Sequence, residues 1–228
     1  MNKKLKNKKK DYDKNYFTKQ FNAVGDFGEV ALKRNKHWFA GQLAFFEKHF
    51  SVSFKKAKKI LEVGCAIGGI ADIFDEKGAK VWAVDISDYA IKKAKKLSPK
   101  IKFMVCDVQK EIPIDERFDL IFAFEVLEHL ENPLLGLVNI RKALDKGGKL
   151  VATTPYPFKK YIEINTHVSV LEPGKWMELM KRAGFKKIKS QPVTFVPFLY
   201  RLNPRLNIIL PFNSNLPFIN STVFYVAQ

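Results

Sequence analysis

Short apolar runs alternate along this chain with longer segments in which apolar residues recur every three or four positions. The short runs predict buried β-strands, and the spacing of three or four predicts amphipathic helices. The predicted strands are residues 60–63, 81–85, 103–107, 118–124, 149–153, 186–196 and 222–227. Because strands and helices alternate, we expect an α/β fold whose mostly parallel sheet carries helices on both faces.

Turn and capping residues mark the ends of the predicted helices. Gly78 stops the helix that follows the first strand, and Ser87 or Asp88 can cap the helix that follows the second strand. Further helices are predicted over residues 133–144, which begin with proline, and over residues 173–183, which glycine follows.

The residues before the first strand divide into two parts. Residues 1–20 contain eight lysines and two aspartates, and we expect a basic, disordered tail there. Residues 21–56 carry apolar residues at helical spacing and predict one or two helices packed on the domain formed by residues 57–228. Aromatic residues at this spacing belong to the core more often than to a site, so Tyr16 and Trp38 are secondary candidates.

Glycine and acidic residues stand at the ends of the first three strands. Gly64, Gly68 and Gly69 follow the first strand and lead straight into a helix, so a ligand can approach the backbone closely. Asp85 ends the second strand 21 residues after Gly64, where a carboxylate can accept hydrogen bonds from ribose hydroxyls. Asp107 ends the third strand in the same way.

These strand ends, together with Glu62 two residues before Gly64, resemble the class I S-adenosylmethionine-dependent methyltransferases. Ala66 replaces the middle glycine of that family's pattern, and it fits if its φ angle is negative. A nicotinamide-cofactor site is disfavoured, because Gly-x-Gly-x-x-Gly is absent and Asp107 has no role in such a site.

The resemblance implies a Rossmann-like, doubly wound, mostly parallel seven-stranded sheet with an antiparallel last strand. It also implies that the helices of residues 21–56 cover the cofactor mouth. The implied cofactor is S-adenosyl-L-methionine, with Glu62, Gly64, Cys65, Ala66, Gly68, Asp85, Ile86, Asp107, Val108, Phe124 and Glu125 as the cofactor-binding residues.

The chain has a formal net charge of +17, of which the first 20 residues supply +6. A basic tail can bind nucleic acid or anionic lipid, although lysine-rich sequences also arise from genome composition. No separate RNA-binding module is visible, so nucleic acid is a less expected partner.

Cysteine usage and hydropathy indicate the compartment. Cys65 and Cys106 fall at predicted buried strand ends, which favours reduced core residues over a disulfide. Neither a secretory signal nor an apolar stretch long enough for a membrane span is predicted. We therefore expect a cytoplasmic protein.

The candidate catalytic residues follow the fourth strand. Glu125, Glu128 and His129 lie at the sheet edge where open α/β folds bind ligands. Their segment resembles the Glu-x-x-Glu-His segment of quinone-biosynthesis O-methyltransferases and of plant small-RNA 2′-O-methyltransferases. It lacks the Asn/Asp-Pro-Pro-aromatic signature of many N-methylases.

In the small-RNA enzymes a further histidine joins this segment in holding a divalent metal, a role that His167 would fill here. An oxygen nucleophile must lose a proton, so His129, His167 and Glu128 are the predicted catalytic residues. Glu128 and His129 could instead cap and brace the helix around them, and our site assignment includes no metal.

Residues 197–220 connect the last two predicted strands and hold more large apolar side chains than a turn requires. This connector could fold over the core, cap a substrate pocket, form a dimer face or contact a membrane surface. The sequence leaves the oligomeric state undetermined.

We predict a methyltransferase that acts on a small-molecule or lipid-like acceptor through an oxygen atom, with peripheral membrane contact as a further hypothesis. Two alternatives stay open: an RNA 2′-O-methyltransferase with a divalent metal, and a protein that binds the cofactor without catalysis.

Overall fold

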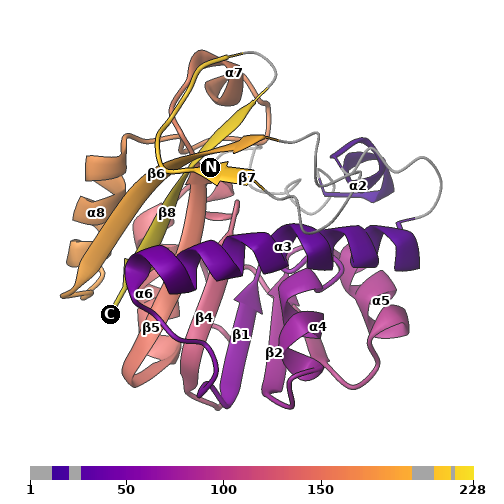
Figure 1. Cartoon of the computed structure of the whole chain (residues 1–228). Helices are drawn as coiled ribbons and strands as arrows, with labels where there is room; N and C mark the ends of the chain where they lie inside the picture. Colours follow the sequence, from indigo (N-terminus) through magenta and orange to yellow (C-terminus); the bar gives the residue numbers. More distant parts are fainter. Residues whose placement is uncertain (1–11, 21–26, 197–207, 217–218) are drawn as a thin grey trace, which may run out of the picture.

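The computed structural model describes residues 12–20, 27–196, 208–216 and 219–228. Their strands form one eight-stranded sheet in the order β3-β2-β1-β4-β5-β8-β6-β7 (Figure 1). The strands are β1 (Lys59–Val63), β2 (Lys80–Asp85), β3 (Lys102–Val105), β4 (Phe118–Phe124), β5 (Leu144–Pro155), β6 (Ile188–Val196), β7 (Ile208–Leu210) and β8 (Asn220–Ala227). Strands β1 to β5 are parallel, and β8 pairs antiparallel with both β5 and β6. The predicted doubly wound sheet with an antiparallel last strand is therefore confirmed.

Helices cover both faces of the sheet. They are α2 (Lys14–Gln20), α3 (Glu29–Phe50), α4 (Gly69–Asp75), α5 (Asp88–Leu97), the 3₁₀ turn η2 (Leu127–His129), α6 (Pro133–Ala143), α7 (Lys159–Ile162) and α8 (Pro173–Arg182). The long helix α3 packs with α4 and α5 on one face, where Phe46, Phe74 and Phe122 are buried together. Helices α6 and α8 cover the opposite face, where Leu137 and Trp176 are buried.

Local sequence signals set several of these ends. The Ser87 hydroxyl accepts a hydrogen bond from the Ala90 amide at 3.2 Å and caps α5, as predicted. Asn132 caps α6 in the same way through the Leu135 amide at 3.1 Å. Gly78 has φ +82° just beyond α4, the left-handed conformation that commonly ends a helix.

Helix α2 corrects the prediction of a disordered tail over residues 1–20. Phe17 is buried, and its ring stacks on Phe27 at 4.9 Å between centroids and on Tyr89 at 6.2 Å. These partners lie outside the tail, so its lysine-rich composition gave no sign of them. Residues 1–11 lie outside the described residues, and a domain boundary near residue 57 stays a prediction.

Strand β7 corrects the predicted number of strands from seven to eight. It lies in the connector of residues 197–220 and pairs antiparallel with β6, with Thr194 opposite Leu210. The Thr194 hydroxyl also donates to the Phe212 carbonyl at 2.6 Å. Three apolar residues of the connector, 208–210, thus form an edge strand, while residues 197–207 and 217–218 lie outside the described part.

The two cysteines and the apolar character of the helices were also subjects of prediction. Cys65 and Cys106 are both buried free thiols, as expected of reduced core residues. Among the helices described, none combines the length and the apolar character that crossing a bilayer requires.

Candidate active site

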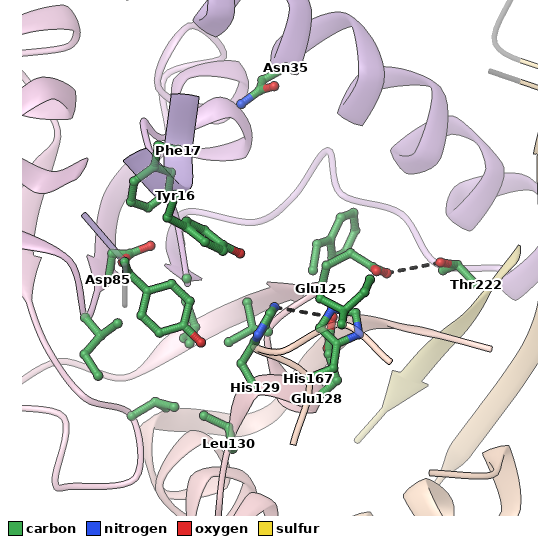
Figure 2. Close-up of a pocket in the computed structure, with 18 of the residues that line it drawn as sticks. Tyr16, Phe17, Asn35, Asp85, Glu125, Glu128, His129, Leu130, His167 and Thr222 are labelled. Carbon is green, nitrogen blue, oxygen red and sulfur yellow. Dashed lines mark hydrogen bonds and ion pairs between the residues drawn. The ribbon is translucent and has the colours of Figure 1, made fainter. Parts of the chain in front are cut away.

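A pocket of about 480 Å³ opens at the carboxyl ends of β1, β2 and β4. Its walls include the glycine turn after β1, the ends of β2 and β4, helices α2 and α3, and the β8 strand (Figure 2). The position agrees with the rule that open α/β sheets bind ligands outside the carboxyl ends of their strands. Seven of the predicted cofactor residues line it: Gly64, Asp85, Ile86, Asp107, Val108, Phe124 and Glu125.

The glycine turn is closely packed against the segment that follows β4. Gly64 has φ +66°, and a Cβ atom there would lie 2.2 Å from Cγ2 of Val126. Ala66 has φ +48°, so the condition under which alanine was expected to replace glycine here, a negative φ, is not met. The Ala66 amide donates to Oδ2 of Asp85 at 2.8 Å, and this bond offsets the cost of a left-handed alanine.

The two aspartates at the strand ends both reach the pocket. Oδ1 of Asp85 accepts from the Ser87 amide at 2.8 Å, and burial raises the pKa of this carboxyl. Oδ1 of Asp107 accepts from the backbone amide of Gln109 at 3.0 Å. Each carboxylate keeps acceptor capacity, since an oxygen has two lone pairs. The roles predicted for them, on ribose and on adenine, stay predictions.

Glu62 does not line the pocket. Its carboxylate accepts from the Ala71 amide at 2.7 Å and from the Ile70 amide at 3.4 Å, so it caps the first turn of α4. Burial raises the pKa of Glu62 to about 8. Cys65, Ala66 and Gly68 are likewise absent from the lining, although all three belong to the glycine turn after β1.

The three predicted catalytic residues come together. Glu128, His129 and His167 each offer a ligand atom within 4.8 Å of the others, and Figure 2 shows them side by side. Nδ1 of His129 lies 2.9 Å from the Thr166 carbonyl, and Nδ1 of His167 lies 2.9 Å from the Tyr161 carbonyl. A carbonyl oxygen only accepts, so each Nδ1 carries a proton, and Nε2 is the nitrogen of each ring that can take up or release one.

Glu128 is fully buried, and neither of its carboxylate oxygens has a hydrogen-bond partner among the described residues. Its Oε1 lies 3.9 Å from Nε2 of His129. Burial, with the nearby Glu125, raises the pKa of Glu128 well above its usual value. Glu125 itself accepts from the Thr222 hydroxyl at 3.2 Å, and burial raises its pKa to about 7. A buried carboxylate with no donor indicates a site for a proton, a cation or a substrate group.

Comparison with known proteins places this chain in a family. A family model described as a methyltransferase domain matches residues 33–190, which is more than half of the chain. The chain belongs to this methyltransferase family. The match includes β1 to β5 and every predicted catalytic residue, so the fold and the pocket are those of a class I S-adenosylmethionine-dependent methyltransferase domain.

Curated relatives of the methyltransferase are 30–31% identical to it over the stretches that align. A sterol 24-C-methyltransferase of Gibberella zeae is 31% identical over 134 residues, which cover 55% of this chain and 33% of that protein. A ubiquinone biosynthesis O-methyltransferase of Coxiella burnetii is 30% identical over 126 residues, which cover 53% of each. The chain thus spans between a third and about half of the length of these two relatives.

Solved structures share the fold at low sequence identity. The magnesium protoporphyrin IX methyltransferase of Synechocystis PCC 6803, with bound SAH, superposes with a TM-score of 0.63 at 12% identity, covering 96% of this chain and 97% of that one. The phosphoethanolamine N-methyltransferase 2 of Haemonchus contortus, in complex with S-adenosyl-L-methionine, gives 0.60 at 17% identity, covering 91% and 59%. S-adenosyl-L-methionine is the cofactor of this domain.

Aromatic residues of α2 and α3 cover the methyltransferase pocket. Tyr16 lines it, and its ring meets Tyr12 edge to face at 4.9 Å between centroids. Burial raises the pKa of Tyr16 to about 12, so its hydroxyl stays protonated at neutral pH. Trp38 lines the other side and packs on Phe195 at 4.7 Å. Both secondary candidates from the sequence therefore belong to the pocket wall.

Several lining residues were not predicted. Asn35 and Gln42 of α3 face the methyltransferase pocket from the same side as Trp38, at helical spacing. That polar and aromatic stripe within one amphipathic helix was the available sequence signal. Thr222 of β8 and Tyr161 reach the pocket through long-range packing, for which the sequence holds no local signal.

Proposed function

We propose that this methyltransferase transfers the methyl group of S-adenosylmethionine to a hydroxyl oxygen of a small aromatic or otherwise flat apolar acceptor. The observation that carries the proposal is the pair of imidazoles, His129 and His167, held beside Glu128 at the pocket wall. The ubiquinone O-methyltransferase relative supports an oxygen acceptor, and the sterol relative supports an apolar one.

The cofactor supplies a sulfonium-bound methyl group that already leaves readily. The protein must align the acceptor oxygen, the methyl carbon and the sulfur, and it must take up the hydroxyl proton. As the oxygen–carbon bond forms and the carbon–sulfur bond breaks, Nε2 of His129 or His167 accepts that proton. The products are the methylated acceptor, S-adenosylhomocysteine and a transiently protonated imidazole.

The histidines are suited to this task. Burial lowers the pKa of His167, so its ring is neutral and ready to accept a proton at neutral pH. The Glu128 carboxyl lies beside Nε2 of His129. When this carboxyl is ionised, its negative charge can stabilise the imidazolium that forms on His129.

The aromatic residues of the pocket support a flat, apolar acceptor. Trp38 and Phe195 form one aromatic wall, and the rings of Phe39 and Phe124 meet edge to face at 5.8 Å between centroids. Aromatic side chains favour offset or edge contacts with other rings. Thr222, which donates a hydrogen bond to Glu125, adds a polar group to the pocket lining.

The test uses labelled S-adenosylmethionine, a panel of phenols and catechols, and amines of the same shapes. We expect the label on the hydroxyl acceptors. We also expect His129→Ala and His167→Ala to lower turnover by about 10²- to 10⁴-fold, with cofactor affinity unchanged. His49→Ala is the matched control, because His49 is exposed on α3 and lies outside the pocket lining.

Label found only on the amines, or a new carbon–carbon bond in the product, would contradict an oxygen acceptor. Near-normal turnover in both histidine variants would leave these residues as structural braces.

A divalent cation is a second candidate for activating the hydroxyl. The donor set fits it: a carboxylate without a donor partner among the described residues, and two imidazoles whose Nδ1 protons are held by carbonyls. Glu128, His129 and His167 would hold the ion, whose charge would lower the pKa of an acceptor hydroxyl.

A bound cation predicts results that the imidazoles alone do not. Calorimetry should detect Mg²⁺ or Mn²⁺ binding that Glu128→Gln weakens, and a chelator should abolish turnover until the ion is restored. Full turnover after chelation would show that the cation is not needed, and the imidazoles would then activate the hydroxyl without it. The same site could serve an RNA 2′-hydroxyl, but the names of the curated relatives above favour a small molecule.

A further inference from the structure

Exposed apolar side chains of the methyltransferase gather at one end of the molecule. In the described part of the chain, eight large apolar side chains are exposed, and five of them lie in residues 162–168 and 212–216. We call these five the apolar rim: Ile162, Ile164, Val168, Phe212 and Leu216. Phe212 is 54% exposed and Leu216 is 62% exposed, although burial would favour both side chains.

The two segments of the rim are joined to each other. The Lys160 ammonium donates to the Leu216 carbonyl at 3.0 Å and to the Ile219 carbonyl at 2.8 Å. The Tyr161 hydroxyl accepts from the Ser221 amide at 2.9 Å. Figure 1 shows α7 enclosed by the turn from β7 to β8, at the top of the molecule and beyond the carboxyl end of β1. The two segments of the rim therefore lie together at this end of the fold.

The rim borders the mouth of the active-site pocket. Ile164 belongs to both the rim and the pocket lining, and Tyr161, His167 and Asn220 line the pocket from the same two segments. An apolar acceptor that leaves an apolar phase at the rim would enter the pocket directly.

Basic charge accompanies this apolar surface. Lys159, on α7, has 87% of its side chain exposed, and Lys160 lies next to it. Glu163 is the only acidic residue in the rim segments and the adjoining α7. Its Oε1 lies 3.6 Å from Nζ of Lys159, so the two side chains form an ion pair. The chain as a whole carries +17. Protruding apolar side chains beside lysines match the interface of an anionic bilayer, where apolar burial and charge attraction add.

We propose that the apolar rim docks the methyltransferase on an anionic membrane surface, with the pocket mouth facing the lipid. The lysines of α7 lie beside these apolar side chains, and this combination favours an anionic bilayer over a purely apolar protein partner.

The test is co-sedimentation of the full chain with phosphatidylcholine vesicles that do or do not contain one third phosphatidylglycerol. We expect binding to the anionic vesicles that weakens as salt rises. The double variant Phe212→Ser and Leu216→Ser should lower the partition coefficient at least tenfold.

The matched control is the double variant Val30→Ser and Leu135→Ser, which removes two exposed apolar side chains from α3 and α6, away from the rim. It should bind as the native chain does. The native chain and both double variants should bind S-adenosylmethionine with equal affinity in calorimetry. This measurement verifies folding without depending on any acceptor.

Three results would overturn the proposal. The native chain could fail to sediment with anionic vesicles at low salt. The rim variant could bind as well as the native chain, which would leave charge alone as the cause. The rim variant could convert a dimer to a monomer without affecting vesicle binding, which would make the rim a protein interface.

Discussion

Replacing Gly64 by alanine tests whether the glycine turn and the catalytic segment are packed as one unit. Gly64 has φ +66°, and the new Cβ atom would lie 2.2 Å from Cγ2 of Val126. Val126 stands between Glu125 and the η2 turn that carries Glu128 and His129. The variant must therefore displace the segment that holds the acid and base groups.

Two costs add in this variant. A left-handed alanine costs roughly 1–2 kcal/mol, and overpacking a closed contact costs roughly 1–3 kcal/mol. Gly78→Ala is the matched control, because Gly78 has φ +82° and nothing within 4 Å of a new Cβ atom. Gly78→Ala therefore carries only the cost of the left-handed alanine. Gly64→Ala should therefore lower the free energy of unfolding by about 1–3 kcal/mol more than Gly78→Ala.

Urea unfolding and calorimetry with S-adenosylmethionine measure the two effects. Gly64→Ala should bind the cofactor more weakly, and Gly78→Ala should bind it normally. Adding Val126→Ala to Gly64→Ala should restore part of the stability, since the smaller side chain removes the contact. Equal destabilisation in the two glycine variants, with no rescue, would refute the close packing.

Two further predictions concern single acids of the pocket. Asp85→Ala should weaken S-adenosylmethionine binding by about 1–3 kcal/mol in calorimetry, because ribose donors would lose their acceptor; unchanged affinity would disprove that role. Glu125 has its pKa raised from 4.5 to about 7, so its protonated form is the one the fold favours. The stability it contributes is present below pH 4.5 and is lost as the pH rises through 7. Glu125→Gln should therefore gain up to about 3 kcal/mol of unfolding free energy over the native chain across this range, and parallel pH profiles would contradict it.

Local patterns in the sequence account for the central sheet and the cofactor edge. Each strand of the sheet from β1 to β5 contains an apolar run, and the residues after it fall at the carboxyl edge because the strands are parallel. Asp85 and Asp107 could therefore be placed beside Gly64 without any tertiary information. The Glu-x-x-Glu-His segment was placed at the same edge by the same reasoning.

The remaining features depend on contacts between distant residues. Helix α2 forms because Phe17 packs on Phe27 and Tyr89, while its own sequence reads as a charged tail. Glu62 turns away from the pocket because the amides of Ala71 and Ile70 need an acceptor. The positive φ of Ala66 depends on a carboxylate 19 residues away. Spacing along the chain encodes none of these partners.

The carbonyls of Tyr161 and Thr166 hold the Nδ1 protons of both histidines, and this has a consequence for how catalysis uses energy. A ring flip would place the Cδ2–H group against the carbonyl oxygen and lose the Nδ1 hydrogen bond, so each imidazole has one favourable orientation. The entropy of orienting the two bases is therefore lost once, when the loop of residues 161–166 folds, and is not lost again at each turnover. The rate of methyl transfer should then depend on how rigid this loop is as much as on the identity of the bases it holds.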